Sequence, residues 1–228
     1  MPSAYPLSQP EARATGWLET PPGRRLLEAV QRAALPEMTR VFGQNGLYLR
    51  PSASISSDLS GNMLANVLSL CRDGGRLSGE LSCLETELPI CSGSMSLVYS
   101  LFVLEASSDP GQLLNELARI LKPGGFVLVL GMNPWSPAQL RWLRPPIPTS
   151  ASKLSRLASE ANLEFVRRQC LGPFWPSAGA PAEDRASAGW LDGFRAASLT
   201  VLRRREAALT PLRKAAGTVS LRPGMSAG

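Results

Sequence analysis

The chain contains no histidine among its 228 residues, and its four cysteines include no C-x-x-C pair. The first absence excludes histidine metal ligands, Ser-His-Asp and Cys-His sites, and a histidine general base. The spacing of Cys71, Cys83, Cys91 and Cys170 indicates neither a zinc site nor a disulfide framework. We therefore expect reduced thiols, no bound metal, and Asp, Glu, Tyr or Lys for any proton transfer.

Long apolar runs are also absent, and none approaches the roughly 18 residues that a membrane-spanning helix needs. Residues 1–17 lack a basic stretch followed by an apolar core, so we do not expect a secretory signal. These absences and the reduced thiols predict a cytoplasmic protein without a transmembrane segment. The hydrophobic content of 44% and the length suit one α/β domain.

The charge balance is basic, with 24 Lys and Arg against 18 Asp and Glu and a net charge of +6. The excess gathers in short arginine clusters and in the C-terminal tail. Aromatic residues do not alternate with these arginines as a base-stacking platform would require, which disfavours nucleic acid as a partner. We expect a solvated basic rim and tail. Attraction to an anionic partner, RNA or a membrane surface, is the alternative interpretation.

Composition divides the chain into three parts. Residues 1–20 are rich in Pro, Ser and Ala and are predicted to be loosely ordered, although Trp17 can dock on the domain. Residues 21–206 form the predicted domain, and residues 207–228 a basic, mobile tail. The Gly/Pro/Ala-rich stretch 171–189 is long for a loop in a compact domain, so we expect a lid on the substrate side or disorder.

Residues 97–136 carry the strongest structural signal. A strand is predicted at 97–101, followed by a helix that begins at Asp109-Pro110, where Asp caps the helix and Pro fits its first turn. A Pro-Gly-Gly turn ends the helix, and a second apolar strand is predicted at 126–130. One β-α-β unit of this kind implies a right-handed crossover and a doubly wound α/β sheet.

Hydrophobic periodicity predicts the remaining elements. The expected helices carry apolar residues on one face, and the expected strands are short apolar runs. The helices are predicted at 22–35, 58–71, 136–143 and 150–162, and the strands at 46–49, 77–81, 164–170 and 199–203.

The pattern LVYSLFVLE followed by DPGQLLNELARILKPGGFVLVL resembles the second half of the class I S-adenosylmethionine-dependent methyltransferase domain, type 11 branch. The stretch GMNPWS at 131–136 resembles a segment of one bacterial sub-branch. The resemblance is strong over residues 85–136 and weaker over 22–84 and 137–214. It implies a Rossmann-like, doubly wound, mostly parallel seven-stranded sheet with helices on both faces and an antiparallel last strand. It also implies S-adenosyl-L-methionine as the cofactor and a small molecule as the methyl acceptor.

The expected cofactor loop departs from the family pattern. In the family a glycine-rich loop follows the first strand, and its backbone amides approach the methionine carboxylate and the ribose of the cofactor. Here residues 50–57 read RPSASISS and contain no glycine. Arg50 stands where the first glycine would be, and Pro51 has no amide donor. The sequence therefore predicts a degenerate cofactor loop.

The resemblance also implies the site, because the cofactor of this fold lies across the carboxyl ends of the strands. An acidic residue at the end of the second strand binds the ribose, the segment 84–88 contacts the adenine, and the end of the fourth strand faces the methionine. No catalytic residue is predicted. The expected cofactor-binding residues are Tyr48, Arg50, Ser52, Glu80, Glu87, Leu88 and Ser100, and the substrate-side residues are Asn133 and Trp135.

Two functions from different classes remain open. One is a methyltransferase with an altered loop, favoured by the retained GMNPWS segment. The other is a pseudo-enzyme, a binding or regulatory module with a protein partner, favoured by Arg50-Pro51. A distant third is an RNA-associated methyltransferase-like protein.

Glu105 is interpreted as a surface charge near the helix, and Asn133-Pro134 can equally be a simple turn.

Overall fold

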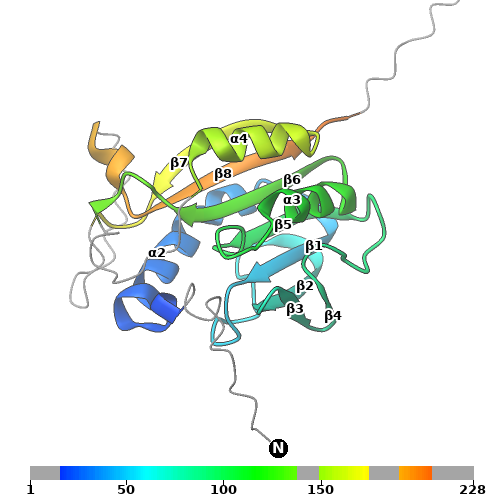
Figure 1. The fold of residues 1–228 in the computed structure, drawn as a ribbon, viewed down its shortest axis with the longest axis horizontal. Helices are drawn as coiled ribbons and strands as arrows, with labels where there is room; N and C mark the ends of the chain where they lie inside the picture. Colours follow the sequence, from blue (N-terminus) through cyan, green and yellow to red (C-terminus); the bar gives the residue numbers. More distant parts are fainter. Residues whose placement is uncertain (1–15, 138–148, 175–189, 207–228) are drawn as a thin grey trace, which may run out of the picture.

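The computed structural model of the chain describes residues 16–137, 149–174 and 190–206. Within them, eight strands form one sheet in the order β4-β3-β2-β1-β5-β6-β8-β7 (Figure 1). The strands are β1 (Phe42–Arg50), β2 (Met63–Asp73), β3 (Arg76–Gly79), β4 (Ser82–Leu84), β5 (Met95–Leu101), β6 (Leu121–Met132), β7 (Leu163–Leu171) and β8 (Ala197–Arg204). The helices are α2 (Pro21–Met38), α3 (Pro110–Ile120) and α4 (Ala151–Glu160), with 3-10 turns η1 (Gly16–Glu19) and η3 (Trp190–Phe194).

The centre of the sheet is parallel. β1 pairs in parallel with β2 and β5, and β5 pairs in parallel with β6, so that Val98 lies between Leu47 and Val127. β8 is antiparallel to both β6 and β7. The predicted Rossmann-like sheet with an antiparallel last strand is therefore confirmed. The predicted count of seven strands is corrected to eight, because β3 and β4 add an antiparallel hairpin at one edge.

The predicted β-α-β unit is present as β5, α3 and β6. The Asp109 carboxylate accepts a hydrogen bond of 3.0 Å from the backbone N–H of Gln112, so Asp109 caps α3 as predicted. The helix ends at Ile120, and β6 begins at the next residue. Gly124 in the Pro-Gly-Gly turn has a φ of 75°, a conformation that residues with a side chain rarely adopt.

Helices cover both faces of the sheet. On one face Leu117 of α3 and Leu154 of α4 join Val98 in a continuous buried core. On the other face α2 and η1 form a second core, in which Trp17 and Leu18 are 7% and 1% exposed. Trp17 therefore docks on the domain as the sequence suggested, and the folded part of the chain includes η1.

The helix predicted for residues 58–71 is wrong. The structure has an irregular crossover over 51–62 and then the strand β2. Gly61 has a φ of 80°, which interrupts any helix there. The Asn62 side chain accepts a 2.9 Å bond from the backbone N–H of Leu64 and so closes a turn immediately before β2. The chain thus crosses from β1 to β2 without the helix that periodicity predicted.

The other predicted elements need smaller corrections. Residues 77–81 lie largely in β3, which is antiparallel and is not the second parallel strand. α2 continues past Pro36 to Met38. The segment 136–143 falls almost entirely outside the described residues. The predictions at 150–162, 164–170 and 199–203 are confirmed by α4, β7 and β8.

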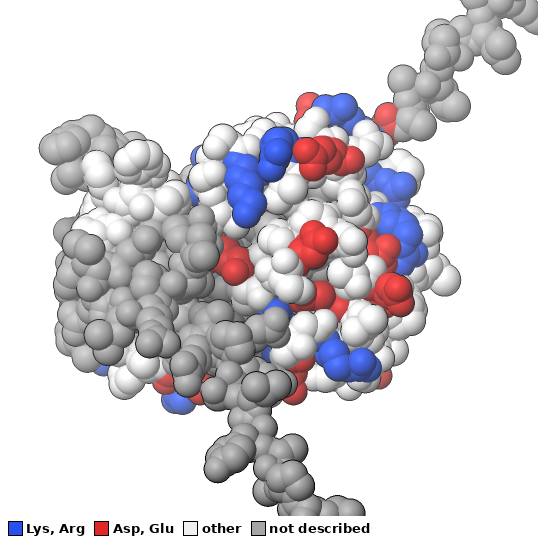
Figure 2. All heavy atoms as spheres, viewed as in Figure 1, with Lys and Arg blue, Asp and Glu red and all other residues white. Residues whose placement is uncertain are grey.

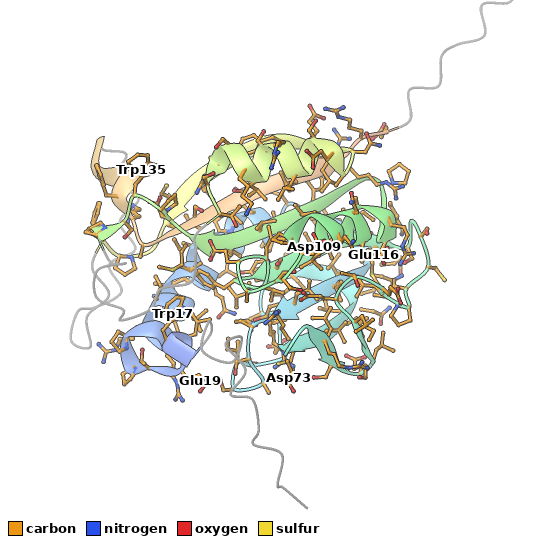
Figure 3. The ribbon with its side chains drawn as sticks, in the orientation of Figure 1. Trp17, Glu19, Asp73, Asp109, Glu116 and Trp135 are labelled. Carbon is orange, nitrogen blue, oxygen red and sulfur yellow. The ribbon has the colours of Figure 1, made fainter. Side chains whose placement is uncertain are left out.

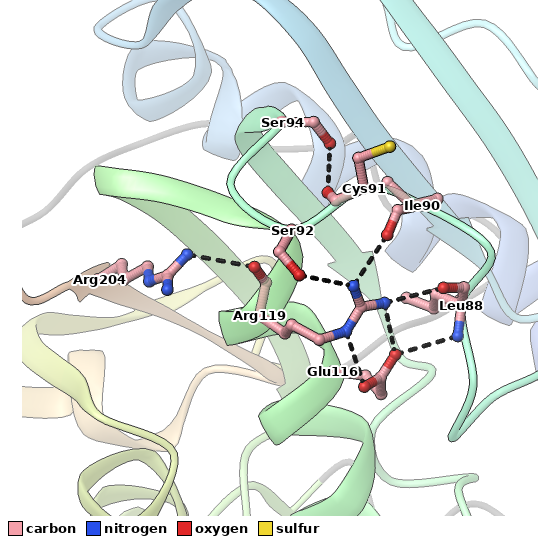
Figure 4. Close-up of polar contacts among 8 residues, drawn as sticks. All are labelled: Leu88, Ile90, Cys91, Ser92, Ser94, Glu116, Arg119 and Arg204. Carbon is pink, nitrogen blue, oxygen red and sulfur yellow. Dashed lines mark hydrogen bonds and ion pairs between the residues drawn. The ribbon is translucent and has the colours of Figure 1, made fainter.

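One arginine of α3 fixes the chain that leads into β5 (Figure 4). The Arg119 guanidinium donates to the carbonyls of Leu88 and Ile90 at 2.8 and 2.9 Å and to the Ser92 hydroxyl at 3.0 Å. Glu116 accepts two bonds from Arg119 and one of 3.0 Å from the backbone N–H of Leu88. The hydrogen bonds from Arg119 lower the pKa of Glu116. One side chain thereby satisfies several backbone groups that secondary structure leaves unpaired.

We expect Arg119→Ala to lower the free energy of unfolding by about 2–3 kcal/mol, because it removes the Arg119 donor from the Ile90 carbonyl and from the Glu116 carboxylate, which keeps only the N–H of Leu88. The Leu88 carbonyl keeps its hydrogen bond from the N–H of Ile90. Urea denaturation measures this loss as a lower midpoint at an unchanged slope. Arg156→Ala is the matched control, since Arg156 meets Glu160 at 3.9 Å with both side chains mostly exposed. It should change stability by less than about 0.5 kcal/mol. Equal effects of the two variants would contradict the role given to Arg119.

Candidate functional site

Four parallel strands end at one edge of the sheet, which we call the carboxyl edge. β1 ends at Arg50, β2 at Asp73, β5 at Leu101 and β6 at Met132. Because the four strands are parallel, their last residues lie along the same edge. Open α/β sheets bind their ligands in the crevice outside this edge, which makes it the candidate site.

Arg50 is a buried cation at the carboxyl edge, with an exposed fraction of 8%. Its Nη1 donates to the backbone carbonyl of Ile55 in the crossover 51–62. Its Nε has no hydrogen-bond partner, and no carboxylate among the described residues forms an ion pair with it. Burial raises the pKa of Tyr48 and of Cys71, and the nearby Arg50 charge opposes both shifts. The edge therefore holds a positive charge that lacks a counter-ion.

Asp73 is the acidic residue at the end of the second parallel strand. Arg50 is paired with Cys71, so Asp73 lies two positions further along the neighbouring strand, and it is exposed. Glu80, which the sequence indicated for the ribose, follows the antiparallel β3 and accepts a 3.5 Å bond from the backbone N–H of Ser69. The structure thus places Asp73, and not Glu80, at the end of the second parallel strand. The Asp-Gly-Gly turn after an apolar stretch was the signal that could have located Asp73.

The N-terminal turn η1 packs over the same edge (Figure 3). The ring of Trp17 meets the ring of Phe102 edge-on, with centroids 5.7 Å apart, and Phe102 directly follows β5. The Glu19 carboxylate accepts hydrogen bonds from the hydroxyls of Ser52 at 2.8 Å and of Ser54 at 3.4 Å. These contacts join η1 to the crossover after β1 and to the end of β5.

Buried polar side chains line the α2 face of the sheet near Arg50. Ser69, Tyr48 and Tyr99 are partners in register on β2, β1 and β5. Tyr48 accepts a 3.0 Å bond from Nε2 of Gln31 in α2, and burial raises its pKa to about 12. The hydroxyls of Ser69 and Tyr99 have no partner in the part of the chain that the structure describes. Native proteins rarely leave buried polar groups unsatisfied, so these groups indicate solvent or a ligand.

Glu105 lies where the ends of β5 and β6 meet. Its carboxylate accepts bonds of 2.8 and 3.0 Å from the backbone N–H of Met132 and one of 3.3 Å from that of Thr149. Burial raises the pKa of Glu105 to about 8, although the two amides and Arg168 oppose the shift. A Cβ at position 131 would lie 2.7 Å from Oε1, so the clamp requires Gly131. Glu105 is therefore a structural clamp and not the surface charge predicted.

Of the remaining predicted cofactor residues, Ser100 lies beside the end of β1, as the register partner of Leu49. Ser100 is fully buried near the end of β5, and its hydroxyl has no partner among the described residues. Leu88 is 4% exposed in the core beneath α3, where Glu116 and Arg119 engage its backbone. Glu87 next to it is exposed. Ser52 lies at the edge, through its contact with η1.

On the predicted substrate side, Asn133 links two loops through its side-chain amide, and we call this set of hydrogen bonds the Asn133 clip. Its Nδ2 donates to the carbonyls of Gly193 at 2.7 Å and Arg195 at 2.8 Å, and its Oδ1 accepts from the backbone N–H of Trp135 at 3.2 Å. These bonds tie the loop after β6 to the turn before β8. Trp135 itself is 76% exposed, so its ring is available to a ligand while its backbone is held.

A hollow of about 450 Å³ lies elsewhere, lined by Glu164, Arg203, Arg204, Arg205 and Glu206. Two of its arginines are already engaged: Arg203 bonds Glu206 at 2.8 Å, and Arg204 donates to the backbone carbonyls of residues 119 and 121. Arg203 pairs with Phe126 in β6, whereas Met132, which ends β6 at the carboxyl edge, lies at the other end of the same strand pairing. The hollow is not part of the carboxyl edge.

Among the described residues visible in Figure 2, surface charge forms no single-signed patch. Basic and acidic side chains alternate over that face. Within the described residues, no helix combines the length and apolar character needed to cross a membrane. The four cysteines are free thiols, two of them buried.

Residues 37–129 match the family described as "Methyltransferase domain", type 11. The matched stretch starts at the end of α2 and contains β1 to β5, α3 and most of β6. No curated protein matches the sequence. Residues 37–129 are thus similar to the methyltransferase family that the resemblance predicted, and this match spans less than half of the chain.

Solved structures share this fold. A SAM-dependent methyltransferase from Aquifex aeolicus is 14% identical with a TM-score of 0.56, over 85% of this chain and 97% of that one. A Haloferax volcanii protein in complex with the Trm112 methyltransferase activator is 18% identical with a TM-score of 0.52, over 86% and 95%. The [4+2]-cyclase SpnF is 14% identical with a TM-score of 0.51, over 79% and 83%. One of these names describes a different reaction, so function must be argued from the site.

Proposed function

We propose that the protein is an S-adenosylmethionine-dependent methyltransferase that acts on a small molecule and binds its cofactor through side chains in place of a glycine-rich loop. The observation that carries the proposal is the placement of Arg50 and Asp73 at the carboxyl ends of the adjacent parallel strands β1 and β2. In this fold those two strand ends face the amino-acid and ribose parts of the cofactor.

The residues at the carboxyl edge fit that cofactor. The exposed Asp73 carboxylate can accept hydrogen bonds from ribose hydroxyls. Arg50 offers an Nε–H that no described residue accepts. When bound, the cofactor supplies an electrophilic methyl group on a positively charged sulfur. Transfer of that group depends chiefly on alignment of the acceptor, so a chain without histidine is compatible with it.

The small-molecule acceptor is supported by Trp135. Its exposed ring can stack on a planar or cationic group, and the Asn133 clip holds its backbone in one position. A fixed aromatic ring next to the end of β6 orients an acceptor at little entropic cost.

A second candidate is a non-catalytic methyltransferase-like protein that binds a protein partner. The contacts of η1 with the carboxyl edge favour this second candidate. Trp17 packs on Phe102, and Glu19 accepts hydrogen bonds from the hydroxyls of Ser52 and Ser54. The structural neighbour from Haloferax volcanii is in complex with an activator protein, which makes a protein partner the corresponding proposal here.

Calorimetric titration with S-adenosylhomocysteine separates the two candidates. The methyltransferase proposal expects saturable binding, and we expect Asp73→Asn to weaken it about 10-fold or more through loss of a charged acceptor. Glu80→Gln is the matched control and should leave the affinity unchanged. Failure of both S-adenosylmethionine and S-adenosylhomocysteine to bind at millimolar concentration would leave the non-catalytic protein as the function. A large effect of Glu80→Gln with none of Asp73→Asn would reverse the roles of these two carboxylates.

A further inference from the structure

The most unusual feature of the carboxyl edge is that the buried side chain of Arg50 has no ion-pair partner among the described residues. Its side chain is buried, yet its only hydrogen bond in the described chain runs from Nη1 to the Ile55 carbonyl. The other buried arginine at this edge, Arg72, has a carboxylate partner, Glu85, at 3.1 Å. Among the described residues Arg50 has none.

A buried guanidinium without a counter-ion is costly, because its desolvation is not offset by an ion pair. Proteins keep such charges mainly where a ligand supplies the missing partner. Guanidinium presents its donors in a planar fork that fits a carboxylate or a phosphate in a bidentate manner. The unused Nε–H belongs to one side of that fork.

Two backbone features that commonly bind anions, an N–H directly after the strand and a helix N-terminus, are missing from the described loop next to Arg50. Pro51 has no N–H, and the crossover 51–62 contains no helix whose N-terminus could face an anion. The side chains of the crossover do bind a carboxylate: the hydroxyls of Ser52 and Ser54 donate hydrogen bonds to Glu19. A carboxylate therefore fits against this loop, beside the strand end that carries Arg50.

We propose that Arg50 is the receptor for a carboxylate ligand at the end of β1 and replaces the backbone amides that a glycine-rich loop would supply. The inference rests on the proposed function in one respect, because the carboxylate is then the one on the amino-acid part of the cofactor. The same chemistry can come from a free carboxylic acid, and the experiment separates the two sources. The Glu19 carboxylate competes for the same loop hydroxyls until the ligand enters.

The test pairs two ligands with two proteins. S-adenosylhomocysteine carries the carboxylate, and 5′-methylthioadenosine lacks the amino-acid carboxylate but keeps the nucleoside and sulfur. The wild-type protein should bind the first about 10- to 100-fold more tightly, the range expected for one charge-assisted, bidentate contact. Arg50→Gln should bind both ligands equally, at the affinity that the wild type shows for 5′-methylthioadenosine. Arg50→Lys should keep only part of the preference, since it keeps the charge and loses the fork.

Each other result is decisive. Equal affinity of the wild type for the two nucleosides, or a preference that persists in Arg50→Gln, would overturn the receptor role while leaving the proposed function intact. If neither nucleoside binds the wild type, the proposed function fails. In that case the melting temperatures of the wild type and Arg50→Gln are compared in malonate and in chloride at equal ionic strength. A rise in malonate that only the wild type shows supports a receptor for free carboxylates. If malonate does not raise the melting temperature of the wild type more than that of Arg50→Gln, the receptor role of Arg50 is overturned.

The folded protein without ligand provides an independent readout. Arg50→Met removes an unpaired buried charge, so its melting temperature should be equal to or above that of the wild type. A fall of more than about 5 °C, which corresponds to more than about 1 kcal/mol in a domain of this size, would assign Arg50 a structural role instead.

Discussion

Replacing Glu85 with alanine is expected to lower the free energy of unfolding by about 3–5 kcal/mol, because it leaves a buried guanidinium without its ion-pair partner. The Glu85 carboxylate meets Nε of Arg72 at 3.1 Å, and both side chains are 3% exposed. Its second oxygen accepts bonds of 2.9 Å from the Ser107 hydroxyl and 3.1 and 3.2 Å from the hydroxyl and N–H of Ser108. Removal of the carboxylate therefore takes away the acceptor of four hydrogen bonds at once.

Urea denaturation followed by circular dichroism measures this loss as a shift of the midpoint. Glu160→Ala is the matched control, because Glu160 is largely exposed and meets Arg156 only at 3.9 Å. It should change stability by less than about 0.5 kcal/mol. The double variant Arg72→Met/Glu85→Leu should recover much of the loss, since apolar side chains of similar volume remove both buried charges. A loss below about 1 kcal/mol in Glu85→Ala would show that the pair is not a structural tie.

The Arg72–Glu85 pair also shapes the candidate site. Arg72 directly precedes Asp73 at the end of β2, while Ser107 and Ser108 lie in the connection from β5 to α3. The pair thus holds the strand end that carries Asp73 against the loop that follows β5. It also occupies the carboxylate of Glu85, one of the residues in the segment 84–88 from which adenine contacts were expected.

The part of the fold that could be predicted is the part whose signals are local. The unit β5-α3-β6 is specified by an apolar strand, a capped amphipathic helix and a Pro-Gly-Gly turn within one short stretch. Asp109 caps α3 as its position predicted, and Ser150 caps α4 by accepting a 3.2 Å bond from the N–H of Lys153. Each of these features depends on residues within four positions of one another, so the sequence alone determines it.

The wrong helix at 58–71 shows where local signals fail. Leu59, Met63, Leu64, Val67 and Leu68 fit a helical face, but a strand buried on both sides is also nearly all apolar. β2 forms a strand because its backbone pairs with β1 and β3, and its buried part is confined to residues 69–72. Pairing with segments distant in the sequence makes this stretch a strand, and local periodicity contains no information about such pairing.

The error in β2 carried over to the candidate site. With the second strand placed at 77–81, Glu80 became the candidate for the ribose; the structure ends that strand at Asp73 instead. Arg50 and Ser52 were located correctly at the end of β1, because β1 itself was predicted. The lack of a counter-ion for Arg50 and the contacts of Glu19 and Glu105 depend on tertiary packing, and no sequence pattern contained them.

Glu105 is expected to make the protein less stable as the pH rises from about 5 to about 8. Its pKa is raised from 4.5 to about 8 in the folded protein, with burial as the main cause. In this window the folded state keeps a proton that the unfolded state has released, so the free energy of unfolding falls with pH. Above pH 8 both states are ionised, and the charged carboxylate then sits between the amides of Met132 and Thr149 with Arg168 nearby.

Glu105→Gln tests this directly, because it resembles the protonated side chain and cannot ionise. A pKa of about 8 in place of 4.5 corresponds to at most about 5 kcal/mol. Since the residue is only half-buried, we expect about 2–4 kcal/mol as the change in relative stability of wild type and variant between pH 5 and pH 8.5. Urea midpoints at several pH values measure it, with Glu160→Gln as an exposed control whose curve should follow the wild type. Parallel curves for the wild type and Glu105→Gln would mean that Glu105 is already ionised at pH 5, and the two backbone amides and Arg168 would then outweigh burial at this position.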